Sequence, residues 1–233
     1  MIQKTRLAGA ADELEEYRLE RIRLIKEGLQ PIALEAGAKV VLHVVPADAF
    51  ENANFDLTLV EDQQANDLKP MAVGGWGPVR FNFDGPMMVT EGKEGAESYV
   101  QVFHNGIVEA VSASYLRRWD NKKLFPGPGL ERMLMEALSD YAKFQSSIGV
   151  TPPLFVMLSL LGLKGYRLIA NESYGFADGR EIDRDDLLVP AVEQSSFDTE
   201  IGQMLRPVFN RVWNAAGYRK SWSYDDSGIR KTR

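Results

Sequence analysis

The residues best suited to chemistry lie in one short acidic run, DGREIDRDD, at positions 178–186. Carboxylate oxygens are the ligands that divalent cations such as Mg²⁺ and Ca²⁺ prefer. One hypothesis is therefore a metal-assisted hydrolase or nuclease that uses this run and one histidine. The run departs from a calcium-binding loop, since it has no glycine at the sixth position and no glutamate at the twelfth. Arginines also interleave its carboxylates, which is typical of a solvated surface loop. The carboxylates are Asp178, Glu181, Asp183, Asp185 and Asp186, and the arginines are Arg180 and Arg184.

The other reactive side chains form no recognisable catalytic set. The chain has no cysteine, which excludes thiolate zinc sites and cysteine nucleophiles. His43 and His104 lack the spacing of paired metal ligands, and no serine lies in a G-x-S-x-G elbow. The glycine-rich stretches at 74–77 and 127–130 lack the Gly-Lys-Ser/Thr of a phosphate-binding loop. The leading interpretation is a protein with no catalytic residue, no metal site and no cofactor, and thus not an enzyme.

Four residues are candidates for binding rather than catalysis. Arg80 and Asp84 lie in or beside the short segment RFNFDG, where Arg80 is expected either to pair with an acidic neighbour or to contact an anion. Trp222 and Tyr224 belong to the aromatic and acidic tail segment WSYDDSG. These two rings are expected either to cover an exposed edge of the core or to form a partner surface.

The charge balance disfavours nucleic acid as a partner of this chain by itself. The chain carries 27 basic and 33 acidic residues, a net charge of -6, and its calculated isoelectric point is about 5.1. Phosphate backbones would therefore meet a repulsive average field. A local basic patch stays possible, either in the segment with Arg117, Arg118, Lys122 and Lys123 or in the tail with Arg230, Lys231 and Arg233. Nucleic-acid binding through the first patch is a third hypothesis.

Nothing in the sequence indicates export or membrane insertion. The N-terminus lacks the basic start and apolar core of a signal peptide. The longest apolar stretch, at 154–163, is far shorter than the roughly 20 residues that cross a bilayer. We therefore expect a cytoplasmic protein that does not enter the membrane.

Local patterns predict the elements that position these residues. Apolar side chains recur at helical spacing in a charged helix over about 12–28, whose narrow stripe docks either on its own domain or on a partner. The β-branched run 40–45 predicts a strand buried on both faces. Two alternating runs joined by Asn105-Gly106 predict a β-hairpin over 99–112. Further helices are expected over 130–147 and from Asp198 to a stop at Gly217, with a buried strand over 154–161 between them.

This order of elements favours one domain over residues 1–233. We predict an α+β fold with a largely antiparallel sheet covered by about three helices, and a parallel doubly wound fold is the second choice.

Several blocks of the sequence resemble one known family. The charged run EEYRLERIRLIKEG, the strand KVVLHVVP, and the later blocks RFNFDG, SLLGLKGYRL and LRPVFNRVWNAAGY are similar to blocks in the C-terminal region of bacterial Schlafen-like proteins with an AlbA-type DNA-binding domain. The AlbA-type domain itself is expected to be absent from this chain, and so are the acidic nuclease residues that belong to it. The resemblance implies a prokaryotic, non-catalytic sensing or protein-interaction module that acts beside a Schlafen AlbA-type partner. A protein partner or a homo-oligomer is expected.

Overall fold

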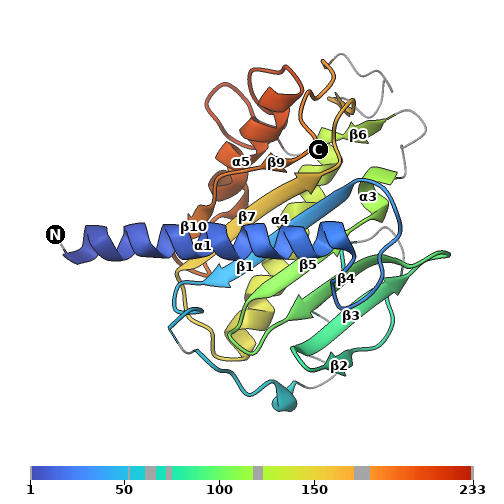
Figure 1. The fold of residues 1–233 in the computed structure, drawn as a ribbon. Helices are drawn as coiled ribbons and strands as arrows, with labels where there is room; N and C mark the ends of the chain where they lie inside the picture. The colour runs from blue at the N-terminus through green and yellow to red at the C-terminus, as the bar shows by residue number, and fades with distance from the viewer. Residues whose placement is uncertain are drawn as a thin grey trace.

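A largely antiparallel sheet forms the centre of the protein and carries helices on both faces. The computed structural model describes residues 2–51, 53–60, 67–71, 75–117, 123–170 and 179–231. The eight-stranded sheet has the order β10-β7-β1-β5-β4-β3-β2, with β9 also paired to β7, and each of these pairs is antiparallel. Figure 1 shows helix α1 crossing one face while helix α4 runs behind the other. The predicted α+β class is confirmed. The strands are β1 (Lys39–Pro46), β2 (Arg80–Asn82), β3 (Gly85–Glu91), β4 (Ala96–Val102), β5 (Val108–Ser112), β7 (Leu154–Leu161), β9 (Leu187–Leu188) and β10 (Val192–Gln194).

Strand β1 is the central strand that its sequence predicts. It pairs with β7 on one side and with β5 on the other. Val40, Leu42 and Val44 belong to the core beneath the helices α4 (Gly127–Ser147) and α5 (Ile201–Ala215), whereas Val41 packs in the core beneath α1. Successive side chains of β1 therefore point to opposite faces of the sheet, and both faces are buried.

Two tight turns shape the other half of the sheet. The predicted hairpin is confirmed as β4 and β5, and Gly106 takes the positive φ of 79° that its turn requires. A second hairpin joins β2 to β3, and β3 is not among the elements predicted from the sequence. A Cβ atom on Gly85, at its start, would lie 2.4 Å from the carbonyl oxygen of Val102. Only glycine therefore fits between β3 and its neighbour.

Helices α4 and α5 cover one face of the sheet. α4 starts three residues before the predicted helix, at Gly127, and ends as expected at Ser147. Glu200 caps α5 by accepting hydrogen bonds from the backbone N–H groups of Gly202 and Gln203, so the predicted cap at Asp198 is wrong. Gly217 follows the helix with a φ of 85°, which confirms the predicted stop.

Helix α1 (Ile2–Glu27) covers the other face and begins about ten residues earlier than predicted. Leu14, Ile22 and Ile25 of its apolar stripe are buried against the sheet. Arg18 of the same stripe donates a hydrogen bond to the carbonyl oxygen of Val189. The stripe therefore docks on the protein's own sheet, which is one of the two alternatives left open by the sequence.

Short elements complete the structure. A 3₁₀ turn (Leu57–Leu59) and helix α3 (Ser114–Arg117) lie in connections, and β6 (Leu124–Pro126) pairs in parallel with β8 (Arg167–Ile169) in a separate two-stranded sheet. Within the part of the chain that the structure describes, no helix combines the length and apolar character needed to cross a bilayer.

Candidate functional site

The outermost strand of the sheet carries the most exposed aromatic side chains of the described residues. β2 pairs with β3 on one side, and no described strand pairs with its other side. Phe81 in β2 is 56% exposed, and Phe83 in the following turn is 96% exposed. We call Arg80, Phe81, Phe83 and Asp84 the β2 edge surface. It combines two large apolar rings with backbone groups that no described strand pairs.

Hydrogen bonds fix the turn that presents Phe83. The side-chain oxygen of Asn82 accepts from the backbone N–H groups of Asp84 and Gly85, at 2.9 and 3.1 Å. The side-chain nitrogen of Asn82 donates to Oε1 of Gln101 at 2.7 Å, and buried Gln101 donates to the carbonyl oxygens of Pro86 in β3 and of Val102 in its own strand β4. The turn is thus tied to the body of the sheet, and Phe83 is held outward rather than left on a loose loop.

Arg80 and Asp84, both predicted as binding residues, lie on this surface. Arg80 Nη2 lies 2.7 Å from Glu91 Oε1, so Arg80 has the acidic neighbour expected as one of its two roles. Both side chains of this ion pair are about half exposed. Such a pair contributes little to stability and leaves the surface accessible.

Trp222 and Tyr224, the other two predicted residues, lie away from β2. They pack beside α5, which contacts β10 at the opposite edge of the sheet. Trp222 is 48% exposed and contacts the rings of Trp213 and Tyr218. Tyr224 is buried and its hydroxyl donates to the carbonyl oxygen of Gly202. The tail aromatics therefore cover the core, and the four candidates do not form one site.

A buried carboxylate anchors that tail. Glu131 of α4 accepts hydrogen bonds from Trp213 Nε1 at 2.8 Å and from the hydroxyl of Ser221. Its second oxygen pairs with Arg230 Nη1 at 2.9 Å. The partners come from α5 and from the tail, so Glu131 links three segments. Arg230, a predicted member of a basic patch, is committed to this structural role.

A second buried carboxylate lies between α1 and the sheet. Glu109 of β5 receives two bonds from Arg21 of α1, at 2.7 and 2.8 Å. It also lies 3.0 Å from Nε2 of His43 and accepts a 2.7 Å hydrogen bond from the hydroxyl of Tyr99. Glu109 and His43 have no exposed surface. Glu109 and His43 are therefore paired with each other in the interior, out of reach of a substrate.

The electrostatics of Glu109 follow from these partners. Burial by itself would raise the pKa of this carboxyl, but the hydrogen bonds and charges of Arg21 and His43 outweigh it and lower the pKa from 4.5 to about 2. Burial, followed by the charge of Glu109, raises the pKa of Tyr99, so its hydroxyl keeps the proton that it donates. Glu109 is therefore a fixed anion that holds α1 on the sheet.

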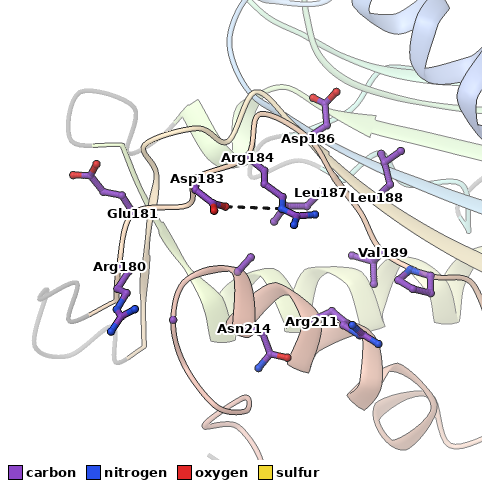
Figure 2. Close-up of a pocket in the computed structure, with 13 residues that line it drawn as sticks. Arg180, Glu181, Asp183, Arg184, Asp186, Leu187, Leu188, Val189, Arg211 and Asn214 are labelled. Carbon is purple, nitrogen blue, oxygen red and sulfur yellow. Dashed lines mark ion pairs between the residues drawn. The ribbon is translucent and has the colours of Figure 1, made fainter.

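The acidic run does not assemble into a metal centre in its described part. Asp178 lies outside the described residues. Glu181 pairs with Arg167 at 2.9 Å, and Asp186 pairs with Lys26 at 2.8 Å. Figure 2 shows these two carboxylates pointing away from each other and away from α5. Among the described residues, no three histidine or carboxylate side chains are grouped so that they could hold a metal ion.

The structure describes only some of the remaining predicted residues. His104 is exposed beside the hairpin turn. Arg118, Lys122 and Arg233 lie outside the described residues, as does the side chain of Arg117. Lys123 donates to the carbonyl oxygen of Lys164. The basic patch at 117–123 therefore stays a prediction.

No family model, curated protein or solved structure matches the chain.

Sequence reasoning did not identify Phe81 and Phe83 as binding residues. The alternation in VRFNF places both rings on one face of a strand, and this pattern ordinarily indicates the buried face. Their exposure depends on β2 being the last strand of the sheet, which is a property of the assembled fold.

Proposed function

We propose that the chain is a non-catalytic protein-interaction module that binds a Schlafen-like partner with an AlbA-type domain through the β2 edge surface, in the cytoplasm of a prokaryote. The observation that carries the proposal is the almost complete exposure of Phe83 on a turn held by hydrogen bonds. The resemblance of several sequence blocks to Schlafen-like proteins supports this choice of partner.

The β2 edge surface has the chemistry of an interface centre. An open strand edge offers backbone N–H and C=O groups to a strand of a partner. Aromatic rings that fill pockets of a partner typically carry much of the binding energy. Phe81 and Phe83 lie at such an edge, and the Arg80–Glu91 ion pair adds a polar rim.

The alternative of a metal-assisted hydrolase or nuclease has less support. In the acidic run Asp185 and Asp186 both face Lys26, whereas Glu181 pairs with Arg167. The buried carboxylates Glu109 and Glu131 are taken up by structural bonds. Uptake of Mn²⁺ or Mg²⁺ with loss on substitution of Asp183 and Asp185 would favour this alternative.

Direct binding to a purified Schlafen-like protein with an AlbA-type domain tests the proposal. Calorimetry should detect a complex, and Phe83→Ser should weaken it at least about tenfold, as expected for the loss of an aromatic anchor. Leu29→Ser is the matched control, because Leu29 is also an exposed large apolar residue but lies at the end of α1. It should leave the affinity unchanged.

Two outcomes would contradict the proposal. One is the absence of binding to the AlbA-type protein, and the other is an equal loss in both variants. Sedimentation of the chain alone would then show whether Phe83 instead supports a homo-oligomer, the second kind of partner expected from the sequence.

A further inference from the structure

A hollow of about 620 Å³ lies between the segment 180–190 and helix α5. Three arginines line it, with Arg180 and Arg184 on the segment and Arg211 on the helix. Its volume falls in the range of roughly 300–1,000 Å³ that is typical of sites for small molecules. This hollow is far from the β2 edge surface, since α5 contacts β10 at the opposite edge of the sheet.

Three carboxylates also line the hollow, but two of them are engaged elsewhere. Glu181 is paired with Arg167 and Asp186 with Lys26, and neither of these bases lines the hollow. In Figure 2 both carboxylates point away from α5, whereas Arg184 extends into the space between the segment and the helix. The charge inside the hollow is therefore more positive than the equal numbers of arginines and carboxylates in its lining indicate.

The third carboxylate neutralises little of that charge. Asp183 lies 3.9 Å from Arg184, and their side chains are 87% and 75% exposed. An exposed pair at this distance is weak. Arg180 and Arg211 form no ion pair with any carboxylate among the described residues. Two guanidinium groups thus remain available, each able to bind a carboxylate or phosphate through two parallel hydrogen bonds.

Apolar side chains form another part of the lining. Leu187 and Val189 are buried residues of the segment, and Pro190 and Ala215 lie beside them. A ligand with an apolar body would bury surface against these side chains while its anionic group meets the arginines. We propose that the hollow binds a small organic anion, a carboxylate or phosphate ester with an apolar body. This inference goes beyond the proposed function and does not depend on it.

Calorimetry with two probes at low ionic strength tests the inference. Inorganic phosphate supplies only the charge, whereas phenyl phosphate adds a planar apolar body. We expect phenyl phosphate to bind at least about tenfold more tightly than inorganic phosphate, because its ring buries area that the ion lacks.

The variant Arg180→Gln/Arg211→Gln should weaken the binding of phenyl phosphate at least about tenfold, since it removes both available guanidinium groups. Both side chains are exposed, and unchanged thermal unfolding will confirm that the variant folds. The matched control is Arg219→Gln/Arg23→Gln, which removes the same amount of positive charge from two exposed arginines that lie outside the lining. This control should keep most of the affinity.

Three results would overturn the inference. They are no detectable binding of phenyl phosphate, equal affinity for the two probes, and equal weakening in the arginine variant and its control. The second would indicate only general attraction of anions. None of these results bears on the binding of a Schlafen-like protein through Phe83, so the two proposals fail independently.

Discussion

Replacing Arg21 with methionine should destabilise the protein strongly, because it removes the main partner of a buried carboxylate. Glu109 has no exposed surface and receives two hydrogen bonds from Arg21. Its pKa is lowered from 4.5 to about 2, and a difference of that size corresponds to about 3 kcal/mol of folding free energy. Removing one partner of a buried ion pair typically costs about 3–5 kcal/mol. We therefore expect Arg21→Met to lose about 3 kcal/mol of unfolding free energy near neutral pH.

The effect should depend on pH in a defined direction. In the unsubstituted protein the folded-state pKa of Glu109 lies below the unfolded value, so its stabilisation is complete above about pH 4.5 and is lost as the pH falls toward 2. Without Arg21, burial is opposed only by His43 and Tyr99, and the pKa of Glu109 rises. The stability difference between the two proteins should therefore become smaller as the pH falls from neutral to about 4.

Urea unfolding of four proteins measures these effects. Arg23→Met is the matched control on the same helix, because Arg23 forms only exposed ion pairs with Glu20 and Glu27. It should leave the unfolding midpoint nearly unchanged. The double variant Arg21→Met/Glu109→Gln should be more stable than Arg21→Met alone, since no unpaired charge then stays buried. Equal midpoints for the two arginine variants, or no recovery in the double variant, would refute this reasoning.

Two further substitutions test other parts of the fold. Gly85→Ala should lower the melting temperature clearly, because its Cβ would lie 2.4 Å from a carbonyl oxygen, whereas Gly28→Ala, also at positive φ but with no atom within 4 Å, should lower it less. Equal effects would mean that backbone conformation alone matters. Glu131→Ala should release the tail, because it loses bonds to Trp213, Ser221 and Arg230, and it should speed hydrogen exchange after Ser221. Exchange that stays as slow as in the unsubstituted protein would show that aromatic packing alone holds the tail.

The sequence predicted the elements whose structure depends on residues that are close together in the chain. The Asn105-Gly106 turn and the β-branched strand β1 each specify their structure within a few residues, and both are confirmed. Strand β3 was missed because it begins with Gly-Pro, which local rules assign to a turn. Its strand character comes from pairing with β2 and β4.

The functional surfaces were harder to predict because they depend on distant parts of the chain. Glu109 alternates with apolar residues in β5, a pattern that ordinarily indicates a solvated side chain. It is buried because α1 covers it, and its partner Arg21 is 88 residues away in the sequence. The exposure of Phe83 likewise depends on where the sheet ends. No local pattern contains this information.

The Arg21–Glu109 contact also sets the register of α1 on the sheet. Apolar packing alone would allow the helix to shift along its axis, because Leu14, Ile22 and Ile25 are all aliphatic side chains of similar size. A shift by four residues along the helix would instead place Tyr17 or Ile25 opposite Glu109, and neither carries a positive charge. A single buried ion pair thus selects one alignment among several that the apolar stripe would accept.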